Sequence, residues 1–485
     1  MKDIAARALD TARSRGASYA DARINEERMQ FVEVKNGRVT AIADTGSMGL
    51  GVRVMVDGAW GFCASAEVNA AEADRCAAVA VEIARASRKV RDTPASLSPL
   101  AAATASWETP YEKDPFRTPL SQKVDLLLAA DKAMRGVAGL KLATSSMQCW
   151  EDRKIFASTE GAYITQRILH TGGGIVATAV SDEDIQVRSY PTSFGGQFES
   201  GGYEVVERLD LPGHAQQTAE EAVALLTAKP CPAGESTIIL DGSQVSLQLH
   251  ESCGHPSELD RVLGWEANYA GMSFLTPEKR NALAYGSPAV SIVADATAQR
   301  GLGTFGFDDE GVPAQRSDLV KDGRFVGYLT SRETAGSLGL ASNGTMRAES
   351  WSHIPLIRMT NINLLPGKWK LEDLVADTPD GIYMLTNRSW SIDDKRYNFQ
   401  FGTEMGYEIK NGKRGAMLKN CTYTGITPRF WNACDAVCDE SDWEIWGTPN
   451  CGKGQPSQTM RTAQGAATAR FQKVQVGVGF KRSAS

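Results

Sequence analysis

The chain has 485 residues and a net charge of −6, from 52 basic and 58 acidic side chains. This length exceeds what a single hydrophobic core ordinarily holds, so two or three domains are expected. The basic residues are scattered, which argues against nucleic acid as the main partner. No run of 18 or more apolar residues predicts a membrane-spanning helix, so we expect no membrane partner.

The N-terminal segment and the cysteines together favour a cytoplasmic location. Residues 1–17 are predicted to form an amphipathic helix and do not resemble a signal peptide. The nine cysteines are odd in number and irregularly spaced, which is not typical of a disulfide framework. Without an export signal, we expect reduced thiols in the cytoplasm.

Residues 1–230 are predicted to form an α+β domain with antiparallel strands. The segment 19–65 alternates apolar and polar side chains around Asn36-Gly37 and Asp57-Gly58, pairs that suit two-residue hairpin turns. We expect an extended surface connection over 89–118 because Pro, Ser, Ala and Thr dominate it. Helices are predicted at 67–88, 119–135 and 214–228, with further strands between 141 and 196.

Residues 235–485 are predicted to form a β-rich second domain. A segment rich in Pro and Gly near 229–236 is the expected boundary. A short strand and an amphipathic helix follow it. Further along, short strands are expected around the turn pairs Asp322-Gly323, Asn343-Gly344, Asp380-Gly381 and Asn411-Gly412.

Two of the five histidines lie in LHESCGHPSE, residues 249–258, five residues apart and with a glutamate after the first. In the His-Glu-x-x-His helix of zinc proteases, the histidines are four residues and about 40° apart, so both reach one metal ion. On an ideal α-helix, His250 and His255 would lie about 140° apart. They could not then share a zinc ion, whose bonds to nitrogen are only about 2.0–2.1 Å long. A shared site therefore requires the helix to deviate.

Gly254 and Pro256 provide a means for this deviation. Glycine tolerates a non-helical backbone, and proline lacks an N–H group and clashes with the carbonyl four residues earlier. We therefore predict a π-type or other wide turn at 252–256 that brings His255 beneath His250. The pattern alone also fits two histidines without a metal and a solvated Glu251. Other segments of the chain are therefore needed to establish whether this is a metal site.

Several ordered segments resemble the TldD/PmbA (TldE) metallopeptidase family, and the likeness covers nearly the whole chain. HESCGHPSELDRVLGWEANYAGMSF, which begins at His250, resembles the family's His-Glu-x-x-x-His segment. Residues 303–339, 347–367 and 450–455 resemble further family segments. The resemblance implies a β-rich C-terminal domain that carries zinc. It also implies a dimer that encloses the active site, either a homodimer or a heterodimer with a TldE/PmbA-like subunit. Because the TldE type lacks this motif, the chain resembles TldD.

The resemblance also implies a third metal ligand, Cys451 in NCGKGQ. A catalytic zinc site needs three protein ligands and one open position, and a thiolate is a suitable soft donor. Four other cysteines stay open as rivals or alternatives. Cys421 could lie in the same domain, and Cys253 lies inside the motif. Cys434 and Cys438 are four apart and could share a helical face, either for a structural metal or for packing.

The function that follows is hydrolysis of unfolded or short peptides inside a dimer, with one Zn²⁺ per chain. His250, His255 and Cys451 would hold the metal, and Glu251 would act as the general base. Glu258 and Asp260 could orient the histidines or could equally be surface charges. One alternative is a non-hydrolytic subunit of a TldD–TldE heterodimer that acts as a peptide-binding scaffold. Another is a narrow role in maturing one peptide product.

Overall fold

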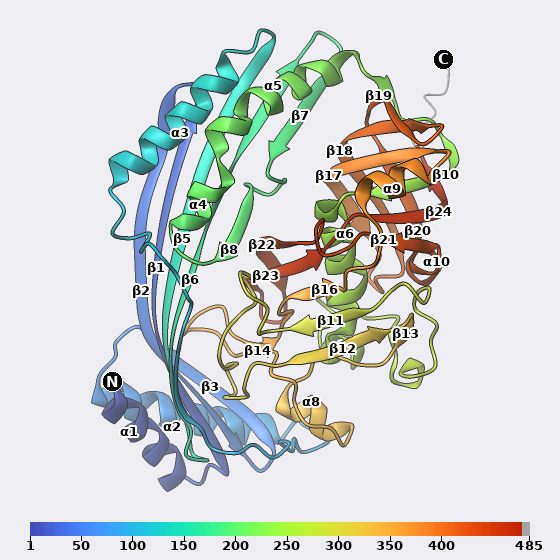
Figure 1. Ribbon diagram of the computed structural model, residues 1–485. Helices are drawn as coiled ribbons and strands as arrows, with labels where there is room; N and C mark the ends of the chain where they lie inside the picture. Colours follow the sequence, from blue (N-terminus) through green and yellow to red (C-terminus); the bar gives the residue numbers. More distant parts are fainter. Residues whose placement is uncertain (478–485) are drawn as a thin grey trace.

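A long eight-stranded sheet runs along one side of the molecule (Figure 1). The computed structural model describes residues 1–477, which have the α+β fold predicted from the sequence. The strand order is β3-β2-β1-β5-β6-β4, and β7 and β8 both pair with β6. The strands are β1 Tyr19–Lys35, β2 Arg38–Val56, β3 Ala59–Ser65, β4 Thr104–Glu108, β5 Leu140–Ser158, β6 Tyr163–Val180, β7 Ile185–Tyr190 and β8 Gln197–Ser200.

Helices cover this sheet in two groups, one toward each end (Figure 1). Near one end, α1 Lys2–Ser14 and α2 Ala70–Arg88 bury their alanine-rich faces against β1, β2 and β3. Near the other end, α3 Leu120–Arg135, α4 Glu204–Leu209 and α5 Leu211–Thr227 enclose a second apolar cluster. Apolar side chains at helical spacing produce both clusters.

A second eight-stranded sheet is built from residues from Lys229 onward. Its order is β17-β10-β24-β20-β18-β19-β9, and β21 pairs with β24. Because β17 also pairs with β18, five of these strands form a closed ring. The domain boundary predicted near 229–236 stays a prediction. The strands are β9 Lys229–Pro230, β10 Gly234–Leu240, β17 Asp380–Ile392, β18 Asn398–Lys410, β19 Lys413–Lys419, β20 Thr422–Ile426, β21 Cys434–Val437 and β24 Ala469–Val476.

Smaller elements lie beside and below the second large sheet (Figure 1). A four-stranded sheet contains β11 Ile292–Asp295, β12 Arg316–Lys321, β13 Arg324–Phe325 and β16 Ile362–Leu364. Two hairpins are β14 Met346–Arg347 with β15 Leu356–Ile357, and β22 Glu444–Lys453 with β23 Gln458–Ala466. The α-helices are α6 Gly242–Leu249, α7 Leu259–Val262, α8 Arg332–Ser337, α9 Leu371–Ala376 and α10 Thr427–Asn432, with a 3₁₀ turn at Pro277–Lys279.

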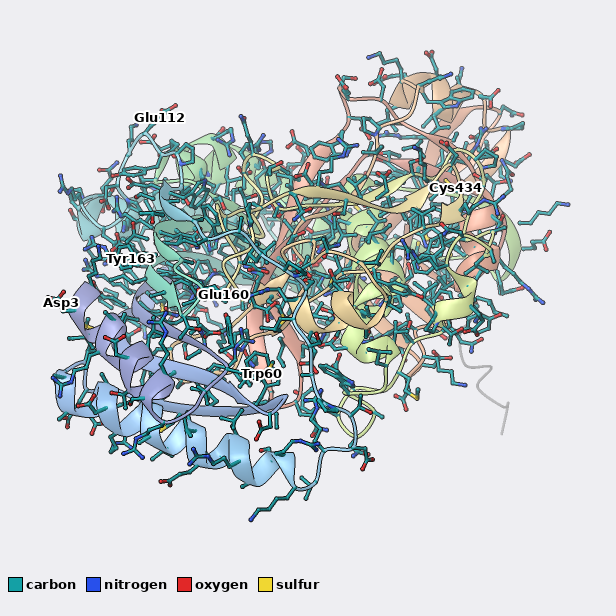
Figure 2. All side chains as sticks on the ribbon, turned by 90° about the horizontal axis from the view of Figure 1, so that it is seen from below. Asp3, Trp60, Glu112, Glu160, Tyr163 and Cys434 are labelled. Atoms are coloured by element: carbon teal, nitrogen blue, oxygen red, sulfur yellow. The ribbon has the colours of Figure 1, made fainter. Side chains whose placement is uncertain are left out.

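Buried polar contacts hold the first sheet against the later elements. Arg53 on β2 pairs with Glu310 at 3.1 Å, and both side chains are almost fully buried. Trp60 donates from Nε1 to Glu333 on α8 at 2.7 Å. Figure 2 shows Trp60 between Cys434 and the N-terminal helices. These contacts fix the first sheet relative to the residues that form the candidate site.

The predicted hairpin turns are largely confirmed. Both residues of Asn36-Gly37, Asp57-Gly58, Asp322-Gly323 and Asn411-Gly412 have positive φ, and each pair joins two antiparallel strands. The turn predicted at Asp380-Gly381 is wrong, because these residues begin β17 and pair with β18. Asn343-Gly344 lies in the loop before β14.

The surface connection predicted over 89–118 is only partly correct. It contains β4, which pairs in parallel with β6 from Thr104↔Tyr163 to Glu108↔Arg167. The pairing partner lies about sixty residues away, so local composition could not reveal this strand. The helix α4 was also missed, because it has only six residues.

Candidate metal centre

Helix α6 carries the first part of the motif into the core. Asp241 caps the helix by accepting a hydrogen bond from the N–H of Gln244 at 3.0 Å. Every residue from Gly242 to Leu249 is buried, and Val245 and Leu249 belong to the large core cluster of the second half. The helix therefore delivers His250 to the protein interior with a fixed position.

The wide turn predicted at 252–256 is present but begins two residues earlier, at His250. Residues His250–Gly254 form a π-helical turn, and the N–H of His255 donates to the carbonyl of His250, five residues earlier. A 3₁₀ turn, His255–Ser257, contains Pro256 and follows at once. The extra residue between the histidines is thus absorbed by one five-residue turn.

Gly254 is needed for a different reason from the one predicted. Its φ is −57°, a value that any residue adopts. A Cβ atom at this position would, however, lie 2.0 Å from Sδ of Met359. Close packing of the turn against Met359 therefore favours glycine here, and conformational freedom is not the reason.

The turn brings together three possible metal donors. The rings of His250 and His255 are 4.9 Å apart and nearly perpendicular. Sγ of Cys451, from β22, lies 3.5 Å from Nε2 of His255. The ligand atoms of all three residues lie within 4.8 Å of one another, and all three are buried. In the part of the chain that the structure describes, this is the one group of its kind.

The electrostatics of these residues suit a metal cation. Burial disfavours the Cys451 thiolate, but the two imidazoles favour it more strongly and hold the pKa of this thiol well below its usual value. Burial lowers the pKa of His255 well below its usual value. Burial also acts to lower the pKa of His250, yet the neighbouring Cys451 thiolate outweighs it and the pKa is raised.

The two histidines differ in the partners of their ring nitrogens. Nδ1 of His255 lies 3.0 Å from Oε2 of Glu258, which leaves Nε2 directed at Cys451. Such a carboxylate fixes the tautomer and ring orientation of a metal-binding histidine. Nδ1 of His250 is buried without a hydrogen-bond partner among residues 1–477. A buried polar nitrogen ordinarily has a partner, so a donor set of two histidines and one cysteine fits a bound zinc ion.

A buried network of charged side chains lies next to the three possible metal donors. Nζ of Lys453, two residues after Cys451, lies 2.7 Å from Asp260, 3.4 Å from Glu258 and 3.3 Å from Glu266. Arg261 pairs with Glu266 at 3.1 Å. Glu258 and Asp260 are therefore buried and are not surface charges, but only Glu258 contacts a histidine. Lys453 was not among the predicted site residues, although its position two residues after Cys451 on a strand places both side chains on one face.

Two arginines that the sequence analysis missed also contact the motif residues. Arg358 donates to the carbonyl of Cys451 at 2.5 Å and to that of Gln458 at 3.2 Å, which fixes the β22–β23 hairpin. Arg396 donates from Nη1 to Oε2 of Glu251 at 2.8 Å. No sequence signal marked either residue, because the partners lie about 90 to 150 positions away.

The rival cysteines lie elsewhere. Cys253 and Cys421 are fully buried in the apolar core and do not join the three-residue group. The helical face predicted for Cys434 and Cys438 is wrong, since Cys434 begins strand β21 and Cys438 follows it. Figure 2 shows Cys434 on the side of the molecule opposite Asp3. Both residues pack as small apolar side chains.

Comparison with known families gives the same picture along the chain. The PmbA/TldA metallopeptidase C-terminal domain matches residues 233–478, domain 1 matches 20–84, and the central domain matches 113–226. The chain belongs to the PmbA/TldA metallopeptidase family. The family resemblance seen in the sequence is thereby confirmed.

Curated relatives of this family carry similar names. A metalloprotease of Methanocaldococcus jannaschii is 28% identical over 90% of this chain and 92% of its own length. A metalloprotease TldD homolog of Haemophilus influenzae is 26% identical over 97% of this chain and 95% of its own. A zinc metalloprotease TldD homolog of Saccharolobus solfataricus is 26% identical over 50% of this chain and 52% of its own.

Solved structures share the fold. TldE from Thermococcus kodakarensis superposes with a TM-score of 0.73 at 13% identity and covers 98% of this chain and 100% of its own. A Thermotoga maritima protein, provisionally described as a modulator of a DNA gyrase, gives a TM-score of 0.78 at 19% identity, covering 98% and 100%. Within residues 1–477, no helix is long and apolar enough to cross a membrane.

Replacing Gly254 by alanine tests the packing of the wide turn. We expect Gly254→Ala to displace the turn from Met359 and to lower zinc affinity at least ~10-fold, measured by competition with a chelating dye. In the double variant Gly254→Ala/Met359→Ala, the clashing sulfur is gone, so zinc affinity should recover toward that of Met359→Ala alone. Unchanged zinc affinity in Gly254→Ala would show that the turn does not set the site.

Proposed function

We propose that the protein is a zinc-dependent peptidase that hydrolyses unfolded or short peptides within a dimeric enclosure. The observation that carries this proposal is the convergence of His250, His255 and Cys451 within 4.8 Å, with Glu251 on the same wide turn. Membership of a metallopeptidase family supports it. We place the enzyme in the cytoplasm and propose two domains, 1–230 and 235–485.

Zinc, at one ion per chain, is the metal that these donors suit best. His250, His255 and Cys451 would hold the ion, and three protein ligands are the number that catalytic zinc sites have. One relative is named a zinc metalloprotease, which supports the same choice. When bound, zinc supplies a Lewis acid that lowers the pKa of a water molecule and polarises a carbonyl group.

The side chains of this protein then perform the proton transfers. Glu251 has one free carboxylate oxygen, because only its Oε2 accepts a hydrogen bond from another described residue. It takes a proton from water as the water oxygen bonds to the carbonyl carbon and the carbonyl electron pair moves onto its oxygen. When the pair returns, the C–N bond breaks, and the departing nitrogen receives the proton from Glu251.

An exposed apolar segment beside the motif supports the enclosure. Four large side chains between α7 and the 3₁₀ turn at Pro277–Lys279 are between 39% and 48% exposed: Leu263, Trp265, Tyr269 and Met272. Exposed apolar clusters of this kind commonly mark protein interfaces. We propose that a second subunit, either another copy or a TldE/PmbA-like chain, covers this segment and restricts access to the site.

Replacing Glu251 by glutamine separates metal binding from hydrolysis. We expect Glu251→Gln to keep about one zinc per chain, since Glu251 is not a ligand, while peptide hydrolysis falls by about 10²–10⁴-fold because the general base is lost. Zinc content and peptide cleavage are measured on the same preparation. Normal hydrolysis by this variant would refute the mechanism. A zinc-loaded wild type that cleaves no peptide would favour the scaffold alternative.

The enclosure predicts selectivity for chains without stable structure. We expect a small folded protein to survive incubation with the zinc-loaded enzyme, while its unfolded form and peptides from its sequence are cleaved. Mass spectrometry of the products gives both rates under one set of conditions. Equal cleavage of the folded and unfolded forms would contradict the enclosure.

A further inference from the structure

Arg396 reaches the site from a part of the chain remote from the motif. It lies in the turn between β17 and β18, and its Nη1 donates to Oε2 of Glu251 at 2.8 Å. The two side chains are only 16% and 8% exposed, so the contact is shielded from bulk water. The mechanism above assigns no role to this arginine.

The backbone of Arg396 is held in an unusual conformation. Its φ is +60°, in the left-handed region that side chains other than glycine rarely adopt. The carboxylate of Asp393 holds the turn by accepting from the N–H groups of Tyr397 at 2.8 Å and Asn398 at 3.1 Å. Thr427 donates its hydroxyl to the carbonyl of Arg396 at 2.9 Å. Such strained conformations are found preferentially at active sites and ligand clamps.

Arg396 also has donors to spare. A guanidinium group carries five N–H donors, and the bond to Glu251 uses one of them. No second side-chain hydrogen bond of Arg396 exists among residues 1–477, and its Nε is buried without a partner. Among the other cations near the ligands, Arg358 binds two carbonyl oxygens through Nη1 and Nη2 and leaves only its Nε without a partner, and Lys453 contacts three carboxylates.

We propose that Arg396 is a further catalytic residue, whose free N–H groups bind the oxygen of the scissile carbonyl as it gains negative charge. This role rests on the proposed peptidase function. A fixed, partly buried cation stabilises such an oxyanion without having to reorganise during the reaction. The same guanidinium binds Glu251 through Nη1. It therefore fixes the position of the carbonyl oxygen of the substrate relative to Glu251, which takes the proton. This contact would involve only the carbonyl oxygen of the substrate, so it would serve any peptide bond regardless of the neighbouring side chains.

The test compares Arg396→Ala and Arg396→Lys with the neighbouring control Lys395→Ala, whose side chain is exposed. All are full-length proteins loaded with zinc. We expect Arg396→Ala to keep the zinc and KM of the wild type but to lose about 10²–10³-fold in kcat, the usual effect of removing an oxyanion donor. Arg396→Lys should retain part of the activity. The Lys395→Ala control should match the wild type.

A second measurement separates binding of the oxyanion from positioning of Glu251. A phosphinic peptide places a charged oxygen where the oxyanion forms, so its affinity should fall with kcat/KM in Arg396→Ala. The same loss should appear when Arg396→Ala is added to a Glu251→Gln background. If the double variant binds the phosphinic peptide as tightly as Glu251→Gln alone, the proposal is overturned, because Arg396 would then act only through Glu251.

The remaining outcomes are also decisive. Loss of zinc or a large fall in melting temperature in Arg396→Ala would show a structural role and overturn the proposal. An active wild type with an equally active Arg396→Ala would refute this role alone. A zinc-loaded wild type without any peptide hydrolysis would refute the proposed function, and this role with it.

Discussion

The hydrogen bond from the N–H of His255 to the carbonyl of His250 is the constraint on which the site depends. On an α-helix, two side chains five residues apart would point about 140° apart around the helix axis. With this hydrogen bond, the two imidazole rings lie 4.9 Å apart. The turn also places Glu251 beside the ligands, because it is the next residue after His250. Its position rests on the buried helix α6 before it and on the close approach of Gly254 to Met359 behind it.

The third donor is set by a different interaction, the buried charges around Lys453. Burying five charged groups costs desolvation energy, and such networks are weak evidence for stability. Here they link β22, which carries Cys451, to Glu258, which orients His255. Two segments about 200 residues apart in sequence are thereby held in register. The buried charges thus contribute by fixing the positions of the ligands, since zinc requires its ligand atoms to be placed to within a few tenths of an ångström.

Local features of the fold could be predicted from the sequence, and long-range ones could not. Asn36-Gly37 specifies its own hairpin, because positive φ at both positions is a property of those two residues. Asp380-Gly381 carries a similar signal, but pairing with β18 overrides it. The wide turn could be predicted from the histidine spacing and Pro256, whereas the role of Gly254 in packing against Met359 could not. The contact between Arg396 and Glu251 spans 145 positions, and no residue pattern in either segment predicts it.

X-ray absorption at the zinc edge of the reconstituted protein tests directly whether His250, His255 and Cys451 hold the metal. We expect about one zinc per chain with two nitrogen ligands at about 2.0–2.1 Å and one sulfur ligand at about 2.3 Å. The sulfur signal should disappear in Cys451→Ala. Zinc bound without sulfur in the wild type, or a protein that takes up no zinc, would show that these three residues do not form the metal site.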